Sequence, residues 1–148
     1  MNLIAAIISG LAGTLAMSML MAAAPKMGMP KMDIVGMLSS MFGKPNRTLG
    51  WVLHFMMGSV FAIIYTALWS FGVGTPNLIY ALVFGAVHWV VAGLTMPVVP
   101  AVHAGIKGGE VAAPGPWMIN QGGLMSFVGG LMGHMVYAIV VVSVFTLL

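Results

Sequence analysis

The chain has 148 residues, of which 61% are hydrophobic and 5% are charged, and its mean hydropathy is +1.09. Soluble domains carry roughly a quarter charged residues, so this composition excludes a soluble globular protein and predicts an integral membrane protein in contact with the lipid bilayer. Cysteine is absent, which excludes disulfides, iron–sulfur clusters, covalent c-type haem and thiolate chemistry. The formal charge of +3 rests on five basic residues, which we interpret as a topology signal, with no nucleic acid as partner.

Four segments are long and apolar enough to cross a hydrocarbon core, which takes about 20 residues. They cover residues 2–24, 48–71, 77–97 and 117–148. Lipid-exposed backbone must satisfy its own hydrogen bonds, so all four are expected to be helices. The sequence predicts an all-α fold: a polytopic membrane four-helix bundle of two helical hairpins, forming a single transmembrane domain over residues 1–148.

The charges predict the orientation of these helices. The first segment has no basic residues before its apolar run, and Pro25 follows its only cleavage-like sequence, so we expect a retained helix and not a signal peptide. The first and third connections hold all the basic residues, and the turn at residues 72–76 holds none; the five are Lys26, Lys31, Lys44, Arg47 and Lys107. The positive-inside rule then places both termini outside a bacterial inner membrane.

The two charged connections differ in their patterns. In the first, Ile34, Met37, Leu38 and Met41 recur at helical spacing after Asp33, which predicts a short interfacial helix over about residues 33–42 with Asp33 as its N-cap. The third is rich in proline and glycine and predicts an irregular loop. The last apolar segment is overlong, so residues 120–123 are expected to lie in the interface.

Two patterns concern how the helices are related and how they pack. Residues 60–64 resemble residues 136–140, and Met21 and Pro25 correspond to Met96 and Pro100. This indicates a possible parallel internal repeat about an axis along the membrane normal, although apolar segments also resemble one another by composition alone. Small residues predict where helices approach one another or another subunit; they are Ala6, Gly10, Gly13, Thr14, Gly58, Ala62, Ala81, Gly85, Gly129 and Gly133.

Three histidines lie within apolar segments, where an ionisable side chain usually faces protein, a cofactor or a conducting path. At 1.5 Å per helical residue, His88 and His134 are roughly 13 and 15 Å above the cytoplasmic surface, and His54 is roughly 9 Å above it. His88 and His134 are therefore predicted to be nearly level on antiparallel helices. His103 falls in the third connection and carries little weight.

Two imidazoles at one height could be axial ligands of a b-type haem, with Arg47 and Lys107 as the basic rim for its propionates. Alternatively, His54, His88 and His134 could converge on one zinc or copper ion. A third interpretation is purely structural, with each histidine hydrogen-bonded across helices.

The sixteen methionines offer soft ligands suited to monovalent copper. Met17 and Met21 form an M-x-x-x-M pair similar to that of eukaryotic copper importers, which makes them further candidate metal ligands. The simpler interpretation is that methionine fills irregular gaps between helices.

A pattern of glycine and histidine runs along the chain: Leu53-His54-Phe55 with Gly58, Gly85-Ala86-Val87-His88, Met96-Pro97, and Gly133-His134 with Tyr137. In this pattern the chain resembles small four-helix bacterial inner-membrane proteins described only as domains of unknown function. That resemblance implies the fold and no activity.

Catalysis has little support, because the only carboxylates, Asp33 and Glu110, lie outside the apolar segments and no phosphate-cradling motif is present. The sequence favours an accessory or binding subunit of a larger membrane assembly, with a redox assembly as one candidate, or else a homo-oligomer. A haem- or copper-binding membrane protein is the first alternative, and a channel or transporter for small solutes or metal ions is the second.

Overall fold

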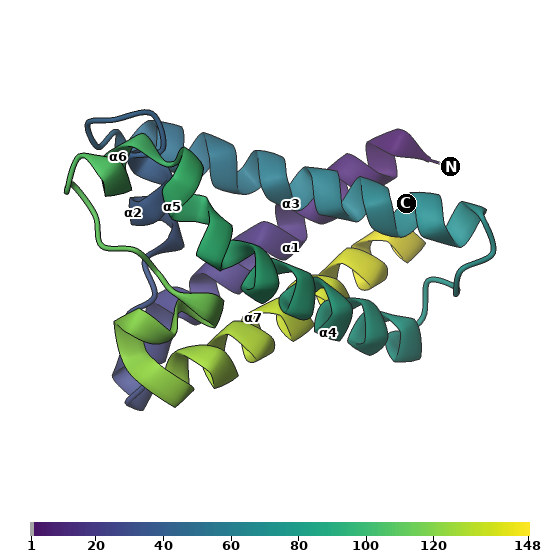
Figure 1. The fold of residues 1–148 in the computed structure, drawn as a ribbon. Coiled ribbons are helices and arrows are strands. Elements are labelled where there is room, and N and C mark those ends of the chain that lie inside the picture. Colours follow the sequence, from purple (N-terminus) through teal and green to yellow (C-terminus); the bar gives the residue numbers. More distant parts are fainter. Residues whose placement is uncertain (1) are drawn as a thin grey trace.

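The computed structural model describes residues 2–148 and contains only helices, turns and loops over that range (Figure 1). Its long helices are α1 (Leu3–Ala23), α3 (Arg47–Ser70), α4 (Leu78–Thr95) and α7 (Ile119–Leu147). Four helical spans within the described residues are long and apolar enough to cross a membrane. The all-α fold class and the four predicted membrane segments are confirmed.

An asparagine side chain caps the N-terminus of three of the long helices. Asn2, Asn46 and Asn77 each accept a hydrogen bond from the backbone amide three residues ahead, which satisfies one of the free amides at a helix start. Helix α7 begins differently, through the 3₁₀ turn η3 (Pro116–Met118). Its backbone is non-helical at Gly122 and Gly123, so the regular part of α7 starts after the residues predicted to lie in the interface.

Glycines set the contacts between the long helices. Helix α1 packs against both α3 and α7, and α4 packs against α7. A β-carbon placed on Gly10 would lie 2.8 Å from the carbonyl oxygen of Gly58, and one placed on Gly85 would lie 3.0 Å from the carbonyl oxygen of His134. Close backbone approach therefore holds the bundle together as predicted, since lipid gives helices no hydrophobic reason to associate.

The best-packed part of the bundle lies toward the chain termini, and we call it the closed end. Its buried cluster consists of Ala62, Tyr65, Ala81, Phe84, Tyr137, Ala138, Val141 and Val142. The Tyr137 hydroxyl donates a hydrogen bond to the carbonyl of Gly58 on α3, and the Tyr65 hydroxyl donates one to the carbonyl of Phe84 on α4. These two bonds link neighbouring helices inside the core.

Short helices cover the opposite end of the bundle. They are η1 (Ala24–Met27), α2 (Ile34–Ser39), η2 (Met96–Val98), α5 (Val99–Val102) and α6 (Ala104–Lys107). Asp33 caps α2 by accepting a hydrogen bond from the amide of Gly36, which confirms the predicted cap and short helix. The amides of Ala104 and Gly105 donate to the carbonyls of Met41 and Ser40, so α6 is fixed to the end of α2.

The third connection is more ordered than the irregular loop predicted for it. Each of its helical turns η2, α5 and η3 carries proline within its first two positions. Proline is tolerated there because the first amides of a helix have no partner within the helix. The same residues that suggested a loop therefore begin three short helical turns.

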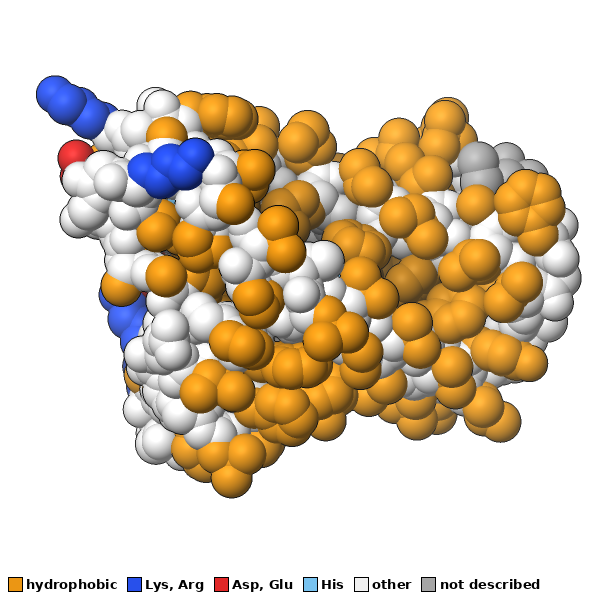
Figure 2. Space-filling model, viewed as in Figure 1, with side chains coloured by type: hydrophobic (Ala, Val, Ile, Leu, Met, Phe, Trp, Pro, Cys, Tyr) orange, Lys and Arg blue, Asp and Glu red, His pale blue; other side chains and the backbone are white. Residues whose placement is uncertain are grey.

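The surface divides into an apolar region and a basic end. Figure 2 shows hydrophobic side chains over α3 and α4, with Lys and Arg side chains gathered at the end covered by the short helices. Many large apolar side chains of the long helices are exposed, Ile4 at 71% and Leu94 at 61% among them. These surfaces fit contact with lipid, and the chain fits a multi-pass membrane protein.

Candidate functional site

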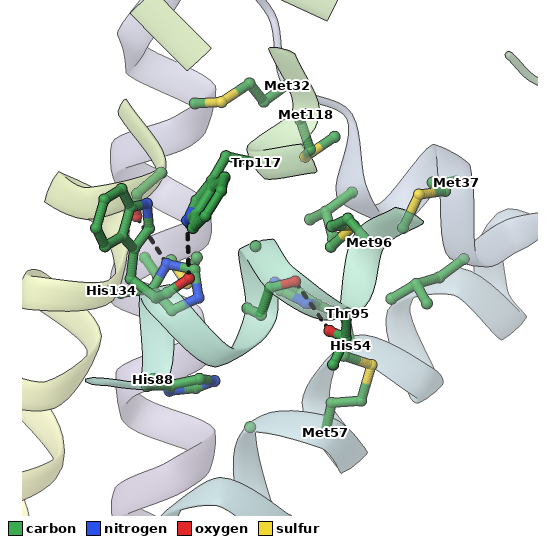
Figure 3. A pocket seen from close by; sticks show the side chains of 18 of the residues that line it. Met32, Met37, His54, Met57, His88, Thr95, Met96, Trp117, Met118 and His134 are labelled. Atoms are coloured by element: carbon green, nitrogen blue, oxygen red, sulfur yellow. Dashed lines mark hydrogen bonds between the residues drawn. The ribbon is translucent and has the colours of Figure 1, made fainter. Parts of the chain in front are cut away.

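A cavity of about 300 Å³ lies at the basic end of the bundle, which we call the cavity end. Helices α1, α2, α3, α4 and α7 all contribute to its wall, and none of its lining residues is charged. All four histidines line it, together with half of the methionines: Met17, Met21, Met32, Met37, Met41, Met57, Met96 and Met118. Methionines and histidines far apart in the sequence therefore meet in one space (Figure 3).

The cavity exists because α3 and α4 are held by different neighbours. Helix α3 packs on α1 and α2, whereas α4 packs on α7 and on η3. Trp117 forms part of the wall: its Nε1–H donates to the carbonyl of Trp89 at 3.1 Å, and its ring sits against Gly93, where a β-carbon would overlap the indole. The surface in Figure 2 is hollowed between α3 and α4.

The backbone at Trp117 and Met118 has the left-handed conformation. Trp117 and Met118 both have positive φ, at 47° and 57°, a conformation that residues other than glycine adopt rarely. Both line the cavity. The local strain, of order 1–3 kcal/mol per residue, is therefore located at the wall of the cavity.

His88 on α4 and His134 on α7 are in direct contact. Their ring centroids are 4.7 Å apart and their planes make an angle of 84°. Both rings are half-buried, and both line the cavity. The structure thus brings together the two histidines that the sequence placed at similar depth.

The hydrogen bonds of this pair define which ring nitrogen carries the proton. His134 Nδ1 lies 2.7 Å from the carbonyl oxygen of Gly130, which can only accept, so Nδ1 is protonated. We assign the proton of His88 to Nδ1 as well, because its partner at 3.2 Å, the Tyr65 hydroxyl, has the Phe84 carbonyl as an acceptor for its own proton. In the neutral imidazoles each Nε2 is therefore an unprotonated acceptor.

His54 belongs to a separate hydrogen-bonded chain. The Ser18 hydroxyl donates to the carbonyl of Thr14 at 2.7 Å, so it accepts from His54 Nε2, which lies 3.1 Å away. Across residues 2–148, no three His, Asp or Glu side chains come close enough together to hold a metal ion. The predicted convergence of all three membrane histidines on one ion is therefore not observed.

The contact between His88 and His134 does not have the geometry of haem ligation. Axial imidazoles lie on opposite faces of the porphyrin. With metal–nitrogen bonds of about 2 Å, their ring centroids would be more than roughly 6 Å apart, whereas the observed distance is 4.7 Å. Neither Arg47 nor Lys107, the predicted basic rim, lines the cavity.

Arg47 has another partner at the surface. Its guanidinium lies 3.0 Å from the carboxylate of Asp33. Partial burial opposes ionisation of Asp33, but the hydrogen bonds from Arg47 and the Gly36 amide, with the charges of Arg47 and Lys31, hold the pKa of this carboxyl below its usual value. This ion pair joins the start of α2 to the start of α3 and so stabilises the cover of the cavity.

His103 is the functional-site residue that the sequence reasoning missed. It is fully buried, its Nε2–H donates to the carbonyl of Met37 at 2.9 Å, and its Nδ1 accepts from the amide of Ile106 at 3.1 Å. Both ring nitrogens are therefore satisfied, and His103 fastens α6 to α2. Only the spacing of His103 and Ile106, typical of a side chain that caps a helix, carried a signal in the sequence.

Several methionines pack against the glycines of α7. The methyl of Met17 would lie 3.2 Å from a β-carbon on Gly133, and the methyls of Met32 and Met29 would lie 2.7 and 3.1 Å from one on Gly129. Met17 and Met21, the predicted M-x-x-x-M pair, both line the cavity. Flexible thioether side chains therefore fill the space that glycine leaves along α7.

Two of the lining residues have buried polar atoms without a hydrogen-bond partner. They are Trp89, through Nε1, and Ser126, through Oγ. An unsatisfied buried polar atom costs about 1–3 kcal/mol, so such atoms are rare in folded proteins and often adjoin functional sites.

The chain belongs to a family of unknown function, DUF6789, whose model matches residues 1–113. The predicted resemblance to a small family of unknown function is confirmed. The match covers α1 to α6 and ends before α7, which supplies His134. No curated protein and no solved structure matches the chain.

Proposed function

We propose that the protein is a membrane-embedded binding protein that takes a small, neutral, lipophilic molecule into the cavity between α3 and α4. Ligand pockets have volumes of about 300–1,000 Å³ and mostly apolar walls with a few polar groups. The cavity has about 300 Å³ and such a wall. An apolar cavity of about 150 Å³ already accepts benzene, so this one has room for a substituted ring or a short chain.

The single observation that carries the proposal is the composition of the wall. Eight methionines and four histidines line a cavity that no charged side chain enters. A charged ligand would lose its hydration there without an opposite charge to compensate. Methionine side chains are flexible and polarisable and are over-used at adaptable binding surfaces, so a neutral apolar molecule is the ligand that this wall suits.

The bilayer is the expected route of entry. Met57 on α3 and Val91 on α4 line the cavity and are also exposed at the surface, at 39% and 45%. A molecule dissolved in lipid would therefore pass between these two helices without crossing water. By the positive-inside rule, the cavity would lie at the cytoplasmic side of a bacterial inner membrane, with both termini outside.

This function is compatible with an accessory role in a larger membrane assembly, because exposed apolar helices can contact other subunits as well as lipid. Transport is less favoured. A conducting path needs continuous polar groups or a gated constriction, whereas at the closed end Ala62, Tyr137 and Val141 are fully packed.

Equilibrium binding of the neutral fluorescent probe N-phenyl-1-naphthylamine tests the proposal. Trp89 and Trp117 line the cavity, so energy transfer from tryptophan to the bound probe reports its arrival. We expect saturable one-to-one binding to the purified protein in nanodiscs and loss of that binding in Ala92→Phe, which places a ring in the cavity. Transfer that never saturates, and is equal in both proteins, would mean that the probe only dissolves in lipid.

A further inference from the structure

We infer that His88 and His134 together select a ligand that carries a hydroxyl donor, and that the ligand class is the lipophilic phenols, hydroquinones included. This inference rests on the proposed binding function and adds to it the chemical group recognised in the cavity. Its basis is the unprotonated Nε2 atom of each ring, which is an acceptor without a hydrogen-bond donor among residues 2–148.

Both rings are fixed in the orientation that leaves Nε2 free. The Gly130 carbonyl holds Nδ1 of His134 and the Tyr65 hydroxyl holds Nδ1 of His88. His88 is further stacked on Phe61, with ring centroids 3.7 Å apart. Because neither ring can turn over without breaking its hydrogen bond, two acceptors are preorganised in an apolar wall, where a matching donor is worth more than in water.

The two threonine hydroxyls of the wall already donate hydrogen bonds to backbone carbonyls. Thr14 donates to the carbonyl of Gly10 at 2.8 Å, and Thr95 donates to the carbonyl of Ala92 at 2.9 Å. No lysine or arginine lines the cavity. The threonine hydroxyls are therefore not available to the two Nε2 acceptors. The two unpartnered donors of the wall, Trp89 Nε1 and Ser126 Oγ, form no hydrogen bond with either Nε2 atom. A hydroxyl on the ligand would supply the missing donor.

The wall around the pair favours an aromatic ligand over an aliphatic alcohol. Phe61, Trp89 and Trp117 line the same cavity as the two histidines, and aromatic rings prefer edge or offset contacts with other rings. Trp117, His88 and His134 all line the cavity and are drawn around it in Figure 3, so a ring bound there would meet indole and imidazole together. A phenol presents a flat ring and a hydroxyl donor in one small neutral molecule.

The test compares two ligands of nearly the same shape, 4-pentylphenol and 4-pentylanisole. The ether replaces the hydroxyl proton by a methyl group and so lacks the donor. Binding to the protein in nanodiscs is measured by displacement of N-phenyl-1-naphthylamine. We expect the phenol to bind about tenfold more tightly than the ether, the effect of one well-placed hydrogen bond.

The variants His88→Leu and His134→Leu are each expected to remove this preference while still binding the ether, which shows that the cavity remains folded. Tyr80→Phe is the control, because Tyr80 does not line the cavity and is 36% exposed, and it should keep the preference. Equal affinity for phenol and ether in the unmodified protein would overturn the inference and leave the binding function standing. Displacement by neither ligand, with no saturable binding of the probe itself, would overturn both.

One further outcome would replace the inference with another. Copper at one ion per chain in the purified protein, lost in both His88→Leu and His134→Leu and retained in His54→Leu, would make the two Nε2 atoms metal ligands. It would overturn recognition of a hydroxyl donor.

Discussion

The two ends of the bundle are built from the same four helices and differ in the side chains that lie between those helices. At the closed end, alanine and glycine allow the helices to touch, and two tyrosines donate hydrogen bonds across them. At the cavity end, methionine and histidine line the space between the helices, and short helices cover it. Both ends are apolar, so the size of the side chains along the helices, and not their apolar character, decides where this bundle closes.

The largest expected effect comes from adding the same ring at each end. Ala62 is fully buried in the closed end, so Ala62→Phe should force α1, α3 and α7 apart and lower the free energy of unfolding by about 3 kcal/mol or more. Ala92 lines the cavity, so Ala92→Phe should fold normally. Thermal unfolding followed by size-exclusion chromatography measures both. Equal losses in the two variants would show that the ends do not differ in packing.

A smaller change compares two glycines that both line the cavity but differ in the space around them, Gly58 and Gly130. A β-carbon on Gly58 would overlap the hydroxyl of Thr14, whereas one on Gly130 would make an ordinary contact at 3.4 Å with Trp89. Gly58→Ala should therefore cost about 1–3 kcal/mol, and Gly130→Ala should be neutral or slightly stabilising, because alanine is the better helix former. Thermal midpoints that fall equally in both variants would contradict the assignment of the close helix crossing to Gly58.

Removing one hydroxyl tests the hydrogen bond across the closed end. Tyr137→Phe leaves the ring and deletes the donor to the Gly58 carbonyl, so we expect a loss of about 1 kcal/mol in unfolding free energy. Tyr80→Phe is the matched control, because Tyr80 is 36% exposed. A midpoint for Tyr137→Phe that equals that of Tyr80→Phe would show that this bond contributes nothing.

The smallest effect concerns the cover of the cavity and depends on pH. The pKa of Asp33 is held below its ordinary value in the folded protein. Its ionised form therefore stabilises the fold above that ordinary pKa, and this contribution is lost as the pH falls through the lowered pKa. The ion pair with Arg47 is exposed, so the effect should stay below about 1 kcal/mol.

Asp33→Asn separates the charge of this residue from its cap, because asparagine caps a helix as well as aspartate does. This variant should lose the pH dependence between pH 5 and pH 3 and keep α2, whereas Asp33→Ala should weaken α2 as well. Thermal midpoints recorded across that pH range show whether the charge of Asp33 causes the pH dependence of stability. The same pH dependence in Asp33→Asn as in the unmodified protein would assign the effect to another group.

Hydropathy was enough to predict most of the fold. Spans of about 20 apolar residues must be helical in lipid, and small residues such as Gly10 and Gly85 marked the real contacts. The third connection was harder, because Pro97 and Pro100 suggest a loop by composition and yet begin helical turns. Proline reports a missing amide and a fixed φ, and both properties fit the start of a helix as well as a loop.

The site could be predicted only in part. Helical rise along antiparallel helices placed His88 and His134 at similar depth, and the two rings do meet. The height of a residue in the membrane does not say on which face of its helix the residue lies. The sequence therefore could not show that His54 lies outside the contact between His88 and His134. The gathering of eight methionines in one cavity depends on how five helices surround the same space. The burial of His103 depends on how α6 packs back onto the carbonyl of Met37. Neither arrangement can be predicted from spacing along the chain.

Native mass spectrometry of the protein released from nanodiscs made with its own host membrane tests most directly whether the cavity end binds a lipophilic molecule. The account predicts a small neutral molecule retained at one copy per chain on the unmodified protein and on Tyr80→Phe, which lies outside the cavity wall. It predicts loss of that molecule from Ala92→Phe, in which a ring fills the cavity. No retained molecule, or the same molecule on Ala92→Phe as on the unmodified protein, would contradict the account.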